Sequence, residues 1–379
     1  MTTSFVRSMS TSKTTSQTEL RATRGHLSRA TPVLVSTLGS ALASAMRSAE
    51  TICARAVVLP RAGQALGFIL ALAVAVGIQT PAVAGKRGVC AKTAKLAFKA
   101  CRAEMKDDHA IALGVCLNES DAGERNDCRN EAKADKNDAS EECRDQLGGR
   151  LEVCDLVGAD AYDPDFDPAR FVDPADIGGS VAPNPYFPLV PGTRWVWVGG
   201  DERITDTVTD ETKLVEGVIC RVVRDVVERD GVAVELTDDW FAQDLDGNVW
   251  YCGEIARNFE TFDGDAPMSP ELVDIDGSWK AGRDGARPGI IMPAEPRVGD
   301  AYREEMSLGE AEDVAEIVSI TGMESVPAAS CSNDCVVTRN ISALEPDVEE
   351  TKYYAPGIGL ILELDPEEPR VELIDFMTP

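Results

Sequence analysis

Six cysteines between residues 90 and 154 constrain the fold of this 379-residue chain more than any other feature. Their sequence separations are 11, 15, 12, 15 and 11, a series that reads the same in both directions. Facing residues of two antiparallel helices have a constant sum of residue numbers, because both helices rise about 1.5 Å per residue. The spacing therefore predicts a two-helix hairpin with three nested disulfides: Cys90–Cys154, Cys101–Cys143 and Cys116–Cys128.

The sequence around these cysteines favours two helices joined by a short turn. Residues 90–117 contain no proline and are rich in Ala and Lys, which are good helix formers. Residues 118–120 are expected to form the turn, and Asp121 with Glu124 has the spacing of a capping box that begins the second helix. Gly148-Gly149 marks the place where the second helix is expected to bend or break.

Disulfides are the chemistry that best fits these cysteines. The chain has no C-x-x-C motif, and His109 is the one histidine after residue 84, which disfavours zinc and covalent haem. Four further cysteines follow. Cys331 and Cys335 are close enough for a small loop bridge, whereas Cys220 and Cys252 lie on predicted strands that are separated by a third strand. A Cys220–Cys252 bridge and cross-pairs with Cys331 or Cys335 both remain open.

The first 84 residues have the features of a presequence. Residues 66–78 are apolar and uncharged, Arg55 and Arg61 precede them, and Ala82-Val83-Ala84 follows, which is typical of a secretory signal cleaved after Ala84. The apolar run is too short for a membrane span, which needs about 20 residues. Residues 1–45 are basic and rich in Ser and Thr, which fits a transit peptide or a functional extension, but a misassigned start upstream of Met46 is the simpler explanation. We therefore expect a secreted, periplasmic or cell-surface protein without a membrane span after cleavage.

The charge of the chain is unevenly distributed and marks the domain boundary. Residues 85–379 have 29 basic and 63 acidic residues, a net charge of −34. Residues 85–158, the predicted hairpin, have 13 basic and 15 acidic residues, so the acidity belongs to the remainder of the chain. Such a charge excludes a broad nucleic-acid or anionic-lipid surface. Salt adaptation, calcium loading and a cationic partner all fit it.

Residues 159–184 are predicted to form an acidic linker. Asp-Pro recurs at 163–164, 167–168 and 173–174, which excludes helix and favours extended or turn structure. The alternation of Asp163, Asp165 and Asp167 resembles the start of a calcium loop, although Pro168 replaces the sixth-position glycine of an EF-hand. These three carboxylates are the candidate metal ligands, with calcium as the one candidate cofactor.

Residues 185–379 are predicted to form an antiparallel β meander. Short alternating stretches are separated by Glu216-Gly217, Asp230-Gly231 and Asp246-Gly247, which are hairpin signals. We expect nine to eleven strands that close into a barrel, a half-barrel or a sandwich. The five tryptophans of the chain all lie here and are expected to fill the core. Residues 285–296 are expected to be a buried crossover loop, with a lid over the barrel mouth as the alternative. The fold class is thus α+β.

Several segments of this region, together with the Cys-rich stretch, resemble recurrent segments of an uncharacterised family of exported bacterial proteins. They include NPYFPLVPGTRW, DLDGNVWY and KYYAPGIGL. The resemblance covers most of the chain after residue 84. It implies a bacterial exported protein and supplies neither an activity nor site residues.

Catalytic motifs are absent from the sequence of the β domain. It has no histidine, no G-x-S-x-G and no phosphate-binding glycine loop. Carboxylates are plentiful and are expected to form a solvated acidic face; only Asp238-Asp239 beside Trp240 and Glu304-Glu305 near Tyr302 stand out. We therefore expect an exported, non-catalytic ligand-binding or surface-interaction module for a cationic or apolar ligand. The alternatives are a carboxylate-dependent glycoside hydrolase or other polysaccharide-active enzyme and a purely structural envelope component.

Overall fold

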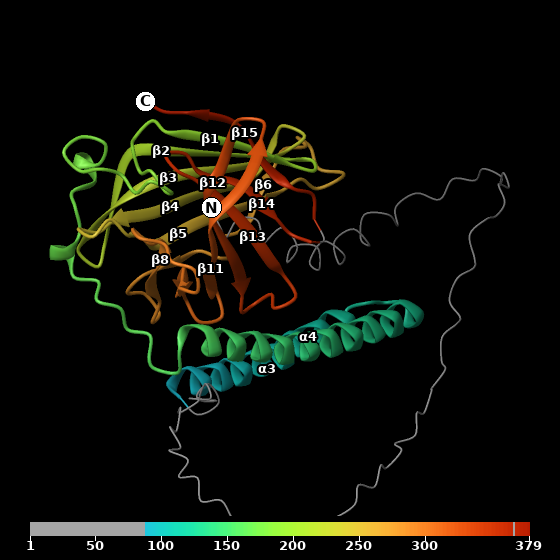
Figure 1. The fold of residues 1–379 in the computed structure, drawn as a ribbon. Helices are drawn as coiled ribbons and strands as arrows, with labels where there is room; N and C mark the ends of the chain where they lie inside the picture. The colour runs from blue at the N-terminus through green and yellow to red at the C-terminus, as the bar shows by residue number, and fades with distance from the viewer. Residues whose placement is uncertain (1–87, 367) are drawn as a thin grey trace, which may run out of the picture. The chain divides into compact units, whose positions relative to one another are not determined.

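A helical hairpin is followed by an all-antiparallel sheet that nearly closes into a barrel in the computed structural model (Figure 1). The model describes residues 88–366 and 368–379. The predicted signal peptide and the start at Met46 lie outside the described residues. The expected α+β fold class is confirmed.

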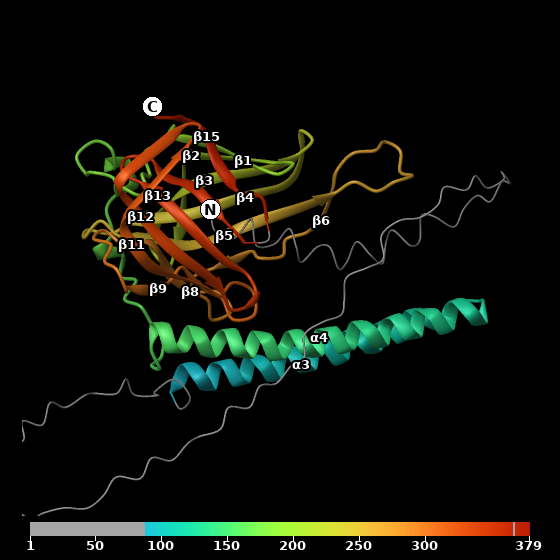
Figure 2. The ribbon, with the colours of Figure 1, turned by 45° about the vertical axis from the view of Figure 1, so that its right-hand side comes forward.

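The hairpin consists of α3 (Val89–Cys116) and α4 (Ala122–Val157), which lie side by side (Figure 2). Three disulfides join the helices in the nested order that the spacing predicts, with Cα–Cα distances of 5.6–5.8 Å. Ordinary helix axes pack about 8–10 Å apart, so this closeness needs small side chains in the seam. Alanines of α3 supply them and are almost fully buried: Ala91, Ala94 and Ala97.

The second helix begins and continues for identifiable reasons. The Asp121 side chain caps α4 by accepting hydrogen bonds from the backbone N–H groups of Gly123 and Glu124. The helix does not break at Gly148-Gly149, because α4 runs on to Val157. Gly149 instead permits a close approach: a Cβ at this position would lie 2.9 Å from the Pro346 side chain. The glycine serves packing against the barrel rather than helix termination.

The acidic linker lies against the barrel through several contacts. It contains two 3-10 helices, η1 (Pro168–Arg170) and η2 (Pro174–Asp176), each capped by the aspartate before it. Phe166 and Phe171 pack on Trp250, with ring centroids 5.9 Å from the tryptophan in both cases. The Arg221 guanidinium donates a 2.7 Å hydrogen bond to the Pro174 carbonyl. These contacts fix the linker to the sheet without regular pairing.

The described residues of the β domain form fifteen strands, more than the nine to eleven expected, because four short segments also pair. The first five strands in the chain are β1 (Arg194–Gly199), β2 (Glu202–Val215), β3 (Val218–Arg229), β4 (Val232–Gln243) and β5 (Val249–Glu260). The short ones are β6 (Glu271–Asp274), β7 (Trp279–Lys280), β9 (Ala301–Arg303) and β10 (Glu305–Met306). The remaining strands are β8 (Arg287–Met292), β11 (Asp313–Val326), β12 (Ala329–Ser342), β13 (Glu349–Ala355), β14 (Gly359–Leu364) and β15 (Val371–Met377).

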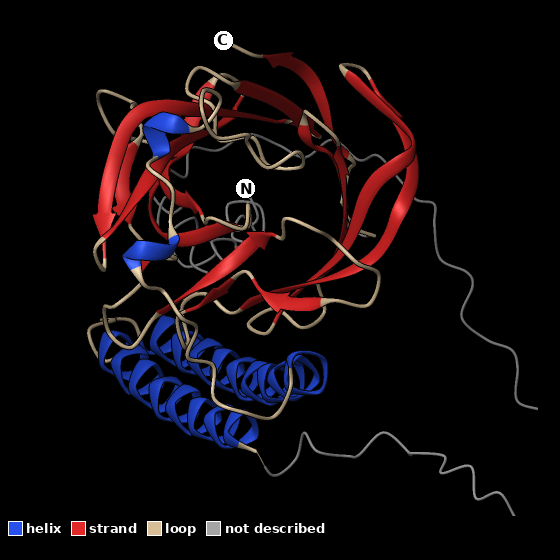
Figure 3. Cartoon of the chain, turned by 60° about the vertical axis from the view of Figure 1, so that its left-hand side comes forward, coloured by secondary structure: helices blue, strands red, loops and turns tan. Residues whose placement is uncertain are grey.

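The strand order explains how the sheet curls around its interior (Figure 3). The order runs from β10 through β8, β5, β4, β3, β2, β1, β15, β14, β13, β12 and β11 to β9, with β6 and β7 on β5. The two ends of this order, β9 and β10, are separated in the chain by Glu304 alone. Residues 301–306, which we call the closing segment, therefore connect β11 to β8 and bring the edges of the sheet together.

Two local features differ from or complete the sequence expectations. Residues 285–296 are not a crossover loop: residues 287–292 form β8, which pairs with β5 and β10, because its apolar residues fill a place inside the sheet.

Cys220 and Cys252 form a disulfide although β4 lies between their strands, and Cys331 pairs with Cys335. The register of β4 with β5 shifts between Trp240 and Phe241, beside Cys252. Such a bulge bends the strands locally, and it accompanies a Cα–Cα distance of 6.9 Å across the intervening strand.

The turns and tryptophans follow the expectations closely. Glu216-Gly217 and Asp230-Gly231 adopt positive φ at both residues, as two-residue hairpin turns require. Trp195 and Trp197 are 3% exposed and donate their indole N–H groups to the carbonyls of Ile358 and Leu360. Trp240 and Trp279 are also buried, whereas Trp250 lies under the linker. No helix among the described residues is long and apolar enough to cross a membrane.

Candidate functional site

The barrel interior contains an unusual number of carboxyl groups. Eleven acidic residues, at most 8% exposed, lie on strands around the sheet or between β9 and β10. Glu202 pairs with Arg229, and Glu235 accepts a hydrogen bond from Thr237. We call the other nine the interior acids: Asp206, Asp225, Asp239, Glu254, Glu304, Glu305, Asp313, Glu350 and Glu363. The cross-strand register places neighbours of this set directly opposite each other, as in Asp206 with Asp225 and Asp239 with Glu254. The expectation of a solvated acidic face is therefore wrong for these residues. Strand alternation turns them inward because the closed sheet has only two faces.

Two carboxyl pairs illustrate what burial does to these groups. Burial raises the pKa of Asp206 well above its usual range, and the facing charge of Asp225 raises it further. Burial likewise raises the pKa of Glu305, and the charges of Asp313 and Glu254 add to the effect. A buried carboxylate without a counter-ion is costly, so such groups keep a proton in the folded state.

A tyrosine between two interior acids supports the same conclusion from geometry. The Tyr251 hydroxyl oxygen lies 2.5 Å from Oδ1 of Asp239 and 2.9 Å from Oε2 of Glu254. A hydroxyl group has one proton to donate, so both contacts are hydrogen bonds only if one of the carboxyl groups is protonated. Burial, with the charges of Asp239 and Glu254, raises the pKa of Tyr251 well above its usual range, so the phenol keeps its own proton.

Lys352 supplies a positive charge to the opposite side of the interior. Its ammonium nitrogen lies 2.8 Å from Oε2 of Glu350 and 3.0 Å from Oε2 of Glu363, and the side chain is fully buried. Burial alone would lower the pKa of Lys352, but the surrounding charges, those of Glu350 and Glu363 foremost, together outweigh it and raise that pKa. Burial, followed by the Glu350 charge, raises the pKa of Glu363 to about 7. The lysine therefore compensates part of the acidity.

Glu304 is the interior acid at the point where the sheet closes. Burial raises its pKa to about 8 although the Lys352 charge opposes the shift. Its Oε2 accepts a 2.8 Å hydrogen bond from the Asn340 side chain, and its backbone N–H donates to the Asp313 carbonyl. A Cβ on Gly289 would lie 2.2 Å from the Glu304 carbonyl oxygen, so the glycine on β8 makes room for the closing segment.

A small cavity adjoins this acid and Lys352. Its polar lining consists of Glu304, Asp313, Asn340, Ser342, Glu350 and Lys352, and its volume of about 10 Å³ corresponds to one water molecule. Stacked and edge-on aromatic side chains, including Phe241, Tyr251 and Trp279, fill the interior near β4 and β5. This cavity has no room for a sugar ring, so its carboxyl groups do not form a glycosidase cleft there.

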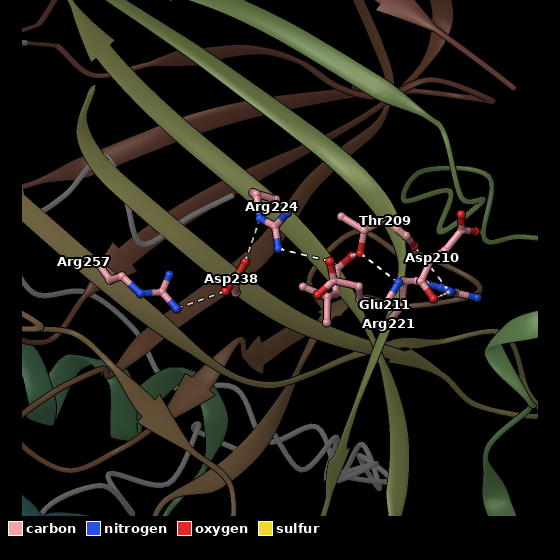
Figure 4. Close-up of polar contacts among 8 residues, drawn as sticks. Thr209, Asp210, Glu211, Arg221, Arg224, Asp238 and Arg257 are labelled. Carbon is pink, nitrogen blue, oxygen red and sulfur yellow. Dashed lines mark hydrogen bonds and ion pairs between the residues drawn. The ribbon is translucent and has the colours of Figure 1, made fainter. Parts of the chain in front are cut away.

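On the outer face of the same strands, acidic side chains form ion pairs with arginines (Figure 4). Arg224 lies 3.0 Å from Asp238 and 3.5 Å from Glu211, and Arg257 lies 3.2 Å from the other oxygen of Asp238. Arg221 donates to the carbonyls of Thr209 and Asp210 at the edge of this network. Outward-facing acids here have arginine partners, in contrast to the interior acids.

The three predicted calcium ligands have separate partners in the structure. Asp163 forms an ion pair with Arg287, Asp165 forms one with Arg170, and Asp167 caps η1 through the Ala169 N–H. Among the residues that the structure describes, no group of three or more His, Cys, Asp or Glu is arranged to hold a metal ion. Calcium binding by this linker stays a prediction.

The end of the hairpin is apolar and exposed. Residues 110–117 carry no charge, although they lie within an otherwise highly charged hairpin. Four large apolar side chains of this stretch, which we call the apolar end, are exposed: Ile111 (60%), Leu113 (36%), Val115 (49%) and Leu117 (65%). They form two i,i+4 pairs on α3 and its last turn, on either side of Cys116, which faces α4. Exposed apolar side chains gathered at one end of a hairpin in this way are typical of an interaction site.

Sequence reasoning found some of these residues and missed others. It singled out Asp239, Glu304 and Glu305 from their aromatic neighbours, and the structure buries all three. It missed Lys352 with Glu350 and Glu363, and it did not remark on the apolar end. One detectable signal was an acid in step with the apolar residues of one strand face, as in Ile204, Asp206 and Val208, and the other was an uncharged run beside the predicted hairpin turn.

No protein-family model, no curated protein and no solved structure matches the chain.

Proposed function

We propose that this chain is an exported, non-catalytic interaction module. In this proposal the barrel is a closed scaffold, and the disulfide-joined hairpin is an arm whose apolar end contacts another molecule. The observation that carries the proposal is the exposure of Ile111, Val115 and Leu117 on a helix that three bridges hold in place.

Export is supported by the chemistry of the cysteines. All ten cysteines of the described residues are in disulfides. Disulfides form and persist in secreted, periplasmic and cell-surface proteins and are rare where thiols are kept reduced. Together with the secretory signal predicted in residues 66–84, this supports an oxidising compartment outside the cytoplasm.

The scaffold role is supported by how the hairpin is attached. Arg150 of α4 forms a bidentate pair with Glu312, in which both side chains are at most 5% exposed. Val153 packs with Val314 and Ala343 of the barrel. Arg150 lies 28 residues from the start of α4, which corresponds to about 42 Å along the helix. The apolar end is therefore far from this attachment point along the arm.

Site-specific photo-crosslinking in the exporting cell tests the proposal. A crosslinking residue at Val115 is expected to give a defined adduct, which disappears when I111S/L117S is introduced into the same chain. The control places the crosslinker at Leu96, which is 60% exposed on α3, compared with 49% for Val115, but lies nearer the attached end of the hairpin. Absence of an adduct at Val115, or an identical adduct at Leu96, would overturn the proposal.

A further inference from the structure

We infer that the apolar end docks a protein surface that presents an apolar patch within a rim of Lys and Arg side chains. This inference rests on the proposed function, because it names the kind of partner that the hairpin arm contacts. It is carried by the charges around the apolar end.

Acidic residues surround the apolar end on both helices. Residues 104–127 contain seven acidic and two basic residues, whereas the rest of the hairpin, residues 85–103 and 128–158, contains eight acidic and eleven basic residues. Asp107 and Asp108 lie one turn before Ile111 on α3 and are exposed. Asp121, also exposed, begins α4 on the other side of the turn. The arm is therefore acidic at its apolar end and slightly basic elsewhere.

Acidic side chains outnumber basic ones around the apolar end by seven to two. Hydrogen bonds from the backbone N–H groups of Glu124 and Gly123 lower the pKa of Asp121, so it is ionised at neutral pH. Arg125, one of the two basic residues in this stretch, donates to the Glu119 carbonyl. The electrostatic field at the apolar end is therefore negative.

This field discriminates among the surfaces that could cover the apolar end. A second copy of the chain, meeting end to end, would bring the same acids together, and like charges across an interface are costly. An anionic membrane surface would be repelled for the same reason. A partner with basic residues around an apolar patch is favoured by two interactions. Apolar contact contributes affinity, and attraction between opposite charges orients the two surfaces and speeds their association.

Binding of two synthetic amphipathic helices to the exported protein tests the inference. The two peptides share one Leu/Ile face and differ only in their flanks, which carry Lys in one and Glu in the other. We expect the Lys-flanked peptide to bind, to weaken as salt increases, and to lose about tenfold in affinity with I111S/L117S. D107N/D108N is expected to weaken binding and reduce its salt dependence, whereas D135N/D138N, which removes two exposed acids elsewhere on α4, is expected to change neither.

The outcomes separate this inference from the proposed function. If the Glu-flanked peptide binds equally well and its binding still requires Ile111 and Leu117, the apolar end remains a docking surface but the partner class is wrong. If the Lys-flanked peptide fails to bind while the Val115 crosslink forms, the inference is likewise overturned and the proposed function stands. If the Lys-flanked peptide binds I111S/L117S as tightly as the wild-type chain, it is recognising general acidity, which also overturns the inference.

Discussion

The protonated interior predicts that this protein loses stability as the pH rises above the acid range. Glu304 illustrates the effect because its folded-state pKa is about 8, whereas a glutamate in the unfolded chain titrates near 4.5. Between these values the folded state holds a proton that the unfolded state has released. The stabilisation is therefore fully present below about pH 4.5 and is lost progressively as the pH rises to about 8.

The size of the effect follows from the width of that interval. One proton of difference changes the free energy of unfolding by about 1.4 kcal/mol per pH unit, so Glu304 accounts for about 4 kcal/mol between about pH 5 and about pH 8. This is comparable with the total stability of many domains, which is about 5–15 kcal/mol. Other buried carboxyl groups with raised pKa, such as Asp206 and Glu305, act in the same direction.

Urea denaturation of wild type and E304Q across this pH range measures the prediction. Glutamine has the shape of the protonated side chain but cannot ionise. As the pH rises, we therefore expect the free energy of unfolding to fall by about 4 kcal/mol less in E304Q than in wild type. The matched control is E211Q, which changes an exposed acid on the outer face and should leave the pH dependence unchanged. Equal losses in wild type and E304Q, or a wild type that becomes more stable with rising pH, would refute the reasoning.

Three further predictions concern packing and ion pairs. R150M leaves Glu312 buried without its partner and should lower the free energy of unfolding by about 3–5 kcal/mol, while R150M/E312L should recover most of the loss in guanidinium titrations. G289A forces a Cβ against the closing segment and should lower the free energy of unfolding by about 3 kcal/mol or prevent folding. Its control is G114A, where a Cβ meets open space, which should leave the free energy of unfolding unchanged or raise it by up to about 1 kcal/mol in the same assay. D238N removes an outer-face network and should cost no more than about 1 kcal/mol by thermal melting; a loss as large as that of R150M would contradict the distinction between exposed and buried pairs.

The helical hairpin and its three bridges could be predicted from the sequence because cysteine spacing encodes axial rise. Each helix advances by a fixed amount per residue, so reflected separations specify both antiparallel direction and pairing. The two-residue turns at Glu216-Gly217 and Asp230-Gly231 were predictable for a similar reason, since left-handed φ is a local requirement. The pairing of Cys220 with Cys252 was not, because it depends on a bulge beside the strand that separates them.

The fate of the acidic residues was decided only by the tertiary structure. Asp238 and Asp239 are adjacent and chemically identical, yet Asp238 faces outward to Arg224 and Arg257 whereas Asp239 is buried against Tyr251. Nothing local distinguishes them, because the choice is set by strand register and by the closure of the sheet through Glu304. The sequence by itself determined the stapled hairpin and the acidity of the β domain. Only the nearly closed sheet decided which carboxyl groups lie at its surface and which are buried, where desolvation raises the pKa of groups such as Asp206 and Glu305. That choice depends on which side of the strand is removed from water.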